Sequence, residues 1–142
     1  MYRSMDYPKH IFKAYDIRGI YPKELNEDVV QSIAESLARF FVSKKRTSSQ
    51  PAAIILGHDV RLSSPRLYRS ALAGLRHKGI RVIQAGRITT PMLYFLVNDL
   101  KADGGVIITA SHNPKNYNGL KIVGKKAVPI SGEEIYAMMT SS

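Results

Sequence analysis

The stretch GGVIITASHNPKNYNGLKIVG, residues 104–124, contains two apolar segments joined by a short polar one. Residues 104–110 and 119–124 each have the pattern of a short buried β-strand. The connection between them is too short for the crossover that joins parallel strands, so the second strand must run antiparallel to the first. This stretch therefore predicts that the last strand of a sheet is antiparallel to its neighbour.

Strands and helices alternate in the rest of the chain. Besides the two strands above, the predicted strands cover residues 51–57 and 80–86. The predicted helices cover 26–45, capped by Asn26, 63–79, with Ser64 as N-cap, and 89–100, a short buried helix starting at Thr90 and Pro91. A final helix opens with the capping box Ser131 to Glu134. This order predicts the α/β class: a three-layer domain with a mixed, mainly parallel four-stranded sheet between helices. We expect residues 1–142 to form a single domain, with a truncation point at about 137–142.

The composition excludes several classes of protein. The chain has 142 residues, of which 44% are hydrophobic, enough for an ordinary core. It has no cysteine, which excludes disulfide bonds and thiolate metal sites. No apolar run approaches the length of about 18 residues that a membrane span needs, and the opening residues MYRSMDYPKH lack the apolar region of a signal peptide. We therefore expect a cytoplasmic protein with no membrane partner.

The net charge of +10 indicates an anionic partner. A small basic module that binds nucleic acid or other anions without catalysis is one candidate function, and a protein that acts on a phosphorylated small molecule is another. The basic residues are scattered, with runs only at 44–46 and 125–126, and no aromatic residues lie between them as a stacking platform. We therefore expect no nucleic acid partner and favour a phosphorylated ligand.

Ser111 follows the predicted strand 104–110, at the edge of the sheet where α/β proteins bind ligands. The neighbouring His112 suggests a hydrolase, but adjacent residues on an extended segment point to opposite sides, and the G-x-S-x-G motif is absent. A nucleophile paired with an adjacent base is therefore a weak hypothesis, and a simple polar turn closed by Pro114 is the plainer interpretation of these residues alone.

Other polar residues change this balance. Asn113 can hold an anion with its amide, and Lys121 lies on the returning strand, from which it can point toward the same edge. Far upstream, FKAYDIRGIYP (12–22) carries Tyr15 and Arg18 in a segment too polar for a core strand. Hydroxyl, ammonium and guanidinium groups together are typical of a phosphate site rather than an acyl-transfer site.

The loop in TASHNPKNYNGLKI (109–122) resembles the phosphoserine loop of the α-D-phosphohexomutases, the phosphoglucomutase and phosphomannomutase family. Three further stretches resemble landmarks of this family in the same order, namely AYDIRG (14–19), GHDVRLSSP (57–65) and GRITTPMLYF (86–95). The resemblance covers roughly residues 11–136 and is strongest to the bacterial phosphomannomutase/phosphoglucomutase branch.

The resemblance implies the roles of the residues near Ser111. Ser111 would carry a phosphoryl group, donate it to a hexose phosphate and recover another from the bisphosphorylated sugar. Lys121 would be the acid or base, and Arg18 would lie beside the phosphoserine with Tyr15 on the same wall. Asn113 would bind phosphate. His112 is interpreted as shaping the loop rather than as transferring a proton.

The resemblance also implies cofactors and missing parts. Mg²⁺ would bind Ser111 through its phosphate, with its other ligands in an aspartate loop of a second domain, and a hexose 1,6-bisphosphate would act as activator. Full members have four domains, so this chain would be the first, with a phosphohexose substrate and the other domains as its partners. Glucose and mannose phosphates both remain candidate substrates. Asp59 and Arg61 of GHDVR are interpreted as structural.

Overall fold

The computed structural model describes residues 7–45 and 48–141, which form an α/β structure around a six-stranded sheet. The strands are β1 (Ile17–Ile20), β2 (Ala52–His58), β3 (Ile80–Arg87), β4 (Gly104–Ile108), β5 (Tyr117–Gly124) and β6 (Pro129–Ile130). The helices are α1 (Glu27–Lys44), α2 (Ser64–Leu75), α3 (Thr90–Asp99) and α4 (Gly132–Thr140), with the short 3₁₀ helices η1 (Lys9–Ile11) and η2 (Lys125–Ala127).

The sheet is mixed, as predicted, and its strand order is β3-β2-β4-β5-β1, with β6 paired to β5. Strand β2 is parallel to β3 and to β4, whereas β5 is antiparallel to β4, β1 and β6. The antiparallel β4–β5 pair confirms the prediction from the short connection. The predicted number of four strands was too low, because β1 and β6 were not recognised, and with them the antiparallel pairs outnumber the parallel ones.

Strand β1 shows that the YDIRG segment, interpreted as too polar for a core strand, forms an edge strand. It lies at an edge of the sheet, where it pairs with β5. Its side chains alternate between buried Ile17 and half-buried Arg18, so one face supplies the core while the other carries the charge. A polar residue on an edge strand is therefore compatible with the core beneath it.

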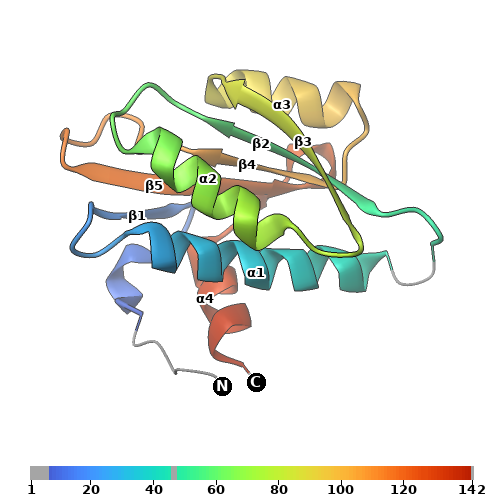
Figure 1. Ribbon diagram of the computed structural model, residues 1–142, viewed down its shortest axis with the longest axis horizontal. Coiled ribbons are helices and arrows are strands. Elements are labelled where there is room, and N and C mark those ends of the chain that lie inside the picture. The colour runs from blue at the N-terminus through green and yellow to red at the C-terminus, as the bar shows by residue number, and fades with distance from the viewer. Residues whose placement is uncertain (1–6, 46–47, 142) are drawn as a thin grey trace.

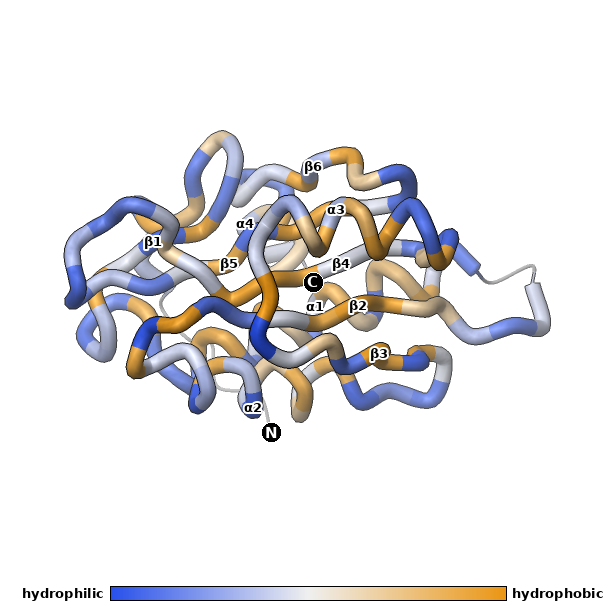
Figure 2. The backbone as a smooth tube through the Cα atoms, turned by 90° about the horizontal axis from the view of Figure 1, so that it is seen from above, coloured by the Kyte–Doolittle hydropathy of each residue, from blue (hydrophilic) through white to orange (hydrophobic). Residues whose placement is uncertain are grey.

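The helices cover the sheet on both faces. Figure 1 shows α3 on one side of the sheet and α1 with α4 on the other. The larger apolar core lies between the sheet and α1, α2 and α4, and a smaller one lies between the sheet and α3. Hydrophobic stretches follow the central strands β2 and β4 in Figure 2, where β2 is buried along nearly its whole length. This burial on both faces is why these segments are continuously apolar.

The helix ends follow the predicted chemistry with two shifts of one residue. Asn26 caps α1 by accepting from the Val29 N–H, and the capping box of Ser131 and Glu134 is present at α4. The N-cap of α2 is Ser63 rather than Ser64, and Thr89 rather than Thr90 caps α3.

Helix α3 is also less buried than predicted. Leu93 and Val97 face the sheet, but Met92 and Phe95 are exposed to 49% and 62%. Within the described part of the chain, no helix is long and apolar enough to cross a membrane.

Strand directions bring several segment ends to one edge of the sheet. Strands β2 and β4 are parallel, and β1 runs in the same direction because both β1 and β4 are antiparallel to β5. The carboxyl ends of β1, β2 and β4 therefore meet at the edge where β5 begins. Ligands of open α/β sheets bind at such an edge.

Candidate functional site at the carboxyl edge of the sheet

Ser111 lies just beyond β4 in an unusual backbone conformation. Its φ is +51°, in the left-handed region that non-glycine residues rarely occupy. Its N–H donates to the Thr109 hydroxyl over 3.1 Å, and Thr109 is buried. A left-handed serine costs on the order of 1–3 kcal/mol and persists only where its surroundings hold it. Such strain is concentrated at functional sites.

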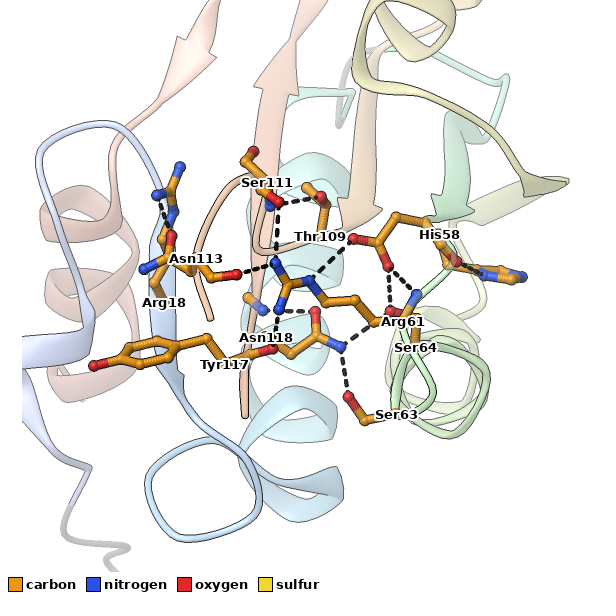
Figure 3. Close-up of polar contacts among 12 residues, drawn as sticks. Arg18, His58, Arg61, Ser63, Ser64, Thr109, Ser111, Asn113, Tyr117 and Asn118 are labelled. Atoms are coloured by element: carbon orange, nitrogen blue, oxygen red, sulfur yellow. Dashed lines mark hydrogen bonds and ion pairs between the residues drawn. The ribbon is translucent and has the colours of Figure 1, made fainter. Parts of the chain in front are cut away.

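Arg61 binds the backbone of the loop that contains Ser111. Its Nη2 donates to the carbonyl oxygens of Ser111 and Asn113 over 3.0 and 2.6 Å. Its Nη1 donates to those of Pro114 and Tyr117 over 2.6 and 3.0 Å. Figure 3 shows the Arg61 guanidinium between these carbonyls, with the loop on one side and α2 on the other. One side chain thus holds both ends of the loop 111–117.

Arg61 is itself held by the segment that follows β2. Asp59 accepts from the Arg61 backbone N–H over 3.0 Å and lies 3.7 Å from its Nε. The Ser64 hydroxyl donates to the same carboxylate over 2.5 Å. Buried Asn118, at the start of β5, donates to the hydroxyls of Ser63 and Ser64. These bonds confirm the structural interpretation of Asp59 and Arg61 and connect β5 to the first turn of α2.

Arg18 reaches the same loop from β1. Its Nε donates to Asp16 over 2.6 Å, and its Nη1 donates to the side-chain oxygen of Asn113 over 2.5 Å. Asp16 is buried and orients the guanidinium. Arg18 thus contacts Asn113, two positions after Ser111 in the sequence. Arg18 and Asn113 are 95 positions apart in the chain.

Lys121 lies on β5, opposite Ile107 of β4. Its neighbours Leu120 and Ile122 belong to the core beneath α1 and α2, so Lys121 is on the opposite face of the sheet. Arg18 is on that same face, because it is opposite Gly119 while Ile17 packs in the core with Leu120. Diagonal positions of this kind are about 7–8 Å apart. The Lys121 ammonium forms no hydrogen bond or ion pair with any described residue.

An open hollow of about 580 Å³ lies beside Ser111. It is lined by Tyr21, Asp59, Val60, Arg61, Leu62, Ser63, Ser111, Asn113, Lys115 and Asn116. The Tyr21 phenol donates to Glu27, and this hydrogen bond raises the pKa of Tyr21 above its ordinary value. The hollow therefore combines a serine, two amides and a lysine with the Asp59–Arg61 ion pair.

Lys121 forms none of these contacts, and two further predicted site residues, Tyr15 and His112, also lie apart from them. Tyr15 precedes β1, is 81% exposed and does not line the hollow. His112 is exposed, and its imidazole forms no hydrogen bond or ion pair with the described residues. The loop is held by Arg61 instead. Sequence reasoning did not predict these carbonyl contacts, although the position of Arg61 just after β2, beside β4, was a signal for them.

Among the described residues there is no group of three or more histidine, aspartate or glutamate side chains that could hold a metal ion. The nearest acids, Asp16 and Asp59, are engaged by Arg18 and Arg61. These residues therefore offer a cation only the oxygens that a phosphoryl group on Ser111 would add.

Comparison with known proteins identifies the family. The family model described as phosphoglucomutase/phosphomannomutase, alpha/beta/alpha domain I, matches residues 9–142. The chain belongs to this family. It is 48% identical over 122 residues to "Phosphohexose mutases" of Xanthomonas campestris pv. campestris (strain B100) and 43% identical over 122 residues to "Phosphomannomutase" of Escherichia coli (strain K12). Both matches cover 86% of this chain and 25% of the relative.

A solved structure shows the same fold. The phosphoglucomutase/phosphomannomutase family protein from Burkholderia thailandensis superimposes with a TM-score of 0.75 and 36% identity, over 92% of this chain and 29% of that one. The chain spans about a quarter of the length of the two curated relatives named above.

Proposed function

We propose that this chain is the phosphoserine-bearing first domain of a phosphohexomutase, and that Ser111 carries the phosphoryl group. The observation that supports this most strongly is the left-handed conformation of Ser111 at the carboxyl edge of the sheet. Membership of the family favours the phosphorylated ligand over the nucleic-acid-binding module as the explanation of the positive charge.

The proposed reaction exchanges one phosphate ester for another. The bond between the Ser111 oxygen and phosphorus breaks while a hydroxyl oxygen of the hexose monophosphate bonds to that phosphorus, which gives a bisphosphorylated sugar. The other phosphoryl group of this sugar then returns to Ser111 and leaves the isomeric monophosphate. Charge spreads over the phosphoryl oxygens in the transition state, so nearby cations do most of the catalysis.

The cations near Ser111 have distinct proposed roles. Arg18, held by Asp16, binds the phosphoryl oxygens together with the amide of Asn113. Lys121, as the neutral amine, receives the proton of the attacking hydroxyl and later, as the ammonium, returns it; its side chain has no other partner among the described residues. His112 and Tyr15 are exposed and remain proposals for shaping the loop and for contacting the sugar.

We propose that Ser111 contributes a phosphate oxygen to Mg²⁺, with its remaining ligands in another part of a longer polypeptide. When bound, the ion would neutralise part of the charge on the transferring group. A hexose 1,6-bisphosphate would restore the phosphoryl group on Ser111. Glucose and mannose phosphates are the proposed substrates, the remaining domains are the proposed partners, and the cytoplasm is the proposed location.

A domain exchange tests this proposal. This chain would replace the matching 122-residue segment of the Escherichia coli phosphomannomutase. We expect the chimera to interconvert hexose 1- and 6-phosphates, and its intact mass to rise by one phosphoryl group after treatment with glucose 1,6-bisphosphate. The Ser111→Ala chimera should show neither property. Retention of the label after this substitution, or a folded chimera with unmodified Ser111, would contradict the proposal.

A further inference from the structure

We propose that Arg61 is a positioning residue that holds Ser111 in its left-handed conformation and so fixes the direction in which its hydroxyl points. The consequence for phosphoryl transfer rests on the proposed function, whereas the conformational effect does not. Arg61 acts through the backbone of the loop and does not contact the phosphoryl group.

The hydrogen-bond count supports this division of roles. The two terminal nitrogens of an arginine carry four N–H donors, and its Nε carries a fifth. In Arg61 the terminal nitrogens face four backbone carbonyls, and the Nε faces Asp59. The side chain is only 15% exposed. No donor of Arg61 is therefore left for a ligand, which distinguishes it from Arg18.

The positions of the four acceptors explain why Arg61 controls Ser111. They belong to Ser111 itself, to Asn113 and Pro114 in the middle of the loop, and to Tyr117, the first residue of β5. Among the described residues, the only other hydrogen bond of the Ser111 backbone is the local one from its N–H to the Thr109 hydroxyl. The carbonyl of Ser111 is thus fixed by a side chain from a different strand connection, and this fixes the rotation about its backbone.

The guanidinium shape is essential for this contact. Its donors form a rigid planar fork that can meet four carbonyls at once, whereas a lysine ammonium offers three donors from a single atom. Arg61→Lys therefore keeps the positive charge but loses the geometry. Asp59 orients the fork before any ligand binds, because it accepts from the backbone of Arg61 as well as facing its Nε.

A thermodynamic comparison on this chain tests the conformational effect. Glycine adopts a positive φ freely and alanine does not, so Ser111→Gly should melt at a higher temperature than Ser111→Ala while Arg61 is present. We expect this difference to close when both substitutions are placed in the Arg61→Lys background, because the loop is then free to relax. An unchanged difference would show that Arg61 does not set the conformation of residue 111 and would overturn the inference.

Kinetics of the chimera test the consequence. Arg61→Lys should lower kcat by about a hundredfold with little change in KM, since misplacing a reacting atom by about 1 Å has an effect of this size. Arg69→Lys, an exposed substitution on α2, is the matched control and should leave both parameters unchanged. If the unsubstituted chimera is not phosphorylated, the proposed function fails, while the melting comparison still decides the conformational effect. An active chimera with unchanged kcat after Arg61→Lys would refute the positioning role.

Discussion

The two arginines at the site use the same chemical group for different purposes. Arg61 donates from its terminal nitrogens to backbone carbonyls, so its guanidinium holds the loop. Arg18 is fixed by Asp16 and Asn113 through Nε and Nη1, and its Nη2 has no partner among the described residues. Arg18 therefore keeps donors for a phosphoryl group and is the cation that we expect to contact it.

Lys121 should be the residue whose loss lowers the rate of the chemical step most. Lys121→Met keeps the length of the side chain and removes the ammonium, so the chimera should lose orders of magnitude in kcat, with a smaller effect on KM. Lys78→Met changes an exposed lysine in the turn before β3 and is the control. Steady-state assays with glucose 1-phosphate measure both. A comparable kcat in the two variants would remove Lys121 from the mechanism.

At the residue scale, the sequence predicted which residues form the site better than it predicted their contacts. Ser111, Asn113 and Arg18 were predicted to lie together, and the structure places Arg18 on Asn113. The carbonyl contacts of Arg61 were not predicted: its position just after β2 indicates that it lies near the loop, but the contacts depend on where that loop, 50 residues away, presents its backbone. Tyr15 and His112 are placed by the resemblance alone, and the described contacts add nothing to their roles.

Strand β5 depends on close approach to its neighbours at Gly119. A Cβ at this position would lie 2.0 Å from the Ile17 carbonyl oxygen of β1 and 3.1 Å from that of Thr109 beyond β4. Neither atom can move without disturbing the pairing of β5. The site edge of the sheet therefore requires the absence of a side chain at this position.

Gly119→Ala should consequently destabilise the chain by about 1–3 kcal/mol, the usual cost of overpacking. Gly124→Ala is the matched control on the same strand, because its Cβ would meet no heavy atom closer than 3.9 Å and its φ of −94° suits alanine. Urea unfolding followed by circular dichroism gives both values. Equal stability of the two variants would mean that β1 does not lie against β5 as described.

Strands and helices could be predicted where the hydrophobic pattern and the length of a segment indicated the same element. The short connection between β4 and β5 determined their antiparallel pairing, and the apolar run at 51–57 determined the central strand. Strands β1 and β6 have four and two residues, too few for a periodicity to show. Helix starts shifted by one residue because Ser63 and Thr89 precede equally good capping residues.

At the scale of the whole molecule we expect this chain to fold by itself but to show no appreciable mutase activity. Apolar cores on both faces of the sheet are complete within the described residues, so unfolding should be cooperative. Activity should be absent because the hollow beside Ser111 is open and the described residues contain no cluster of acids for a metal ion.

A coupled assay with glucose 1-phosphate and Mg²⁺ on the folded chain measures this, with circular dichroism to confirm the fold. The chimera serves as the positive control under the same conditions. Turnover by the isolated chain within about tenfold of the chimera, a difference of only about 1.4 kcal/mol in the barrier, would show that the catalytic groups lie within this domain.

The contacts of Arg61 join segments that are far apart in the sequence. They therefore also determine when, during synthesis, the loop with Ser111 can reach its final conformation. The acceptors of Arg61 lie 50–56 residues downstream, and Arg18 and Asn113 are 95 residues apart. Contacts between such distant segments form late, because the entropy of closing the intervening chain opposes them. On a nascent chain, Ser111 should thus lack these contacts until the segments that form them have been synthesised. We therefore expect Ser111 to reach its left-handed conformation only after the sheet has assembled.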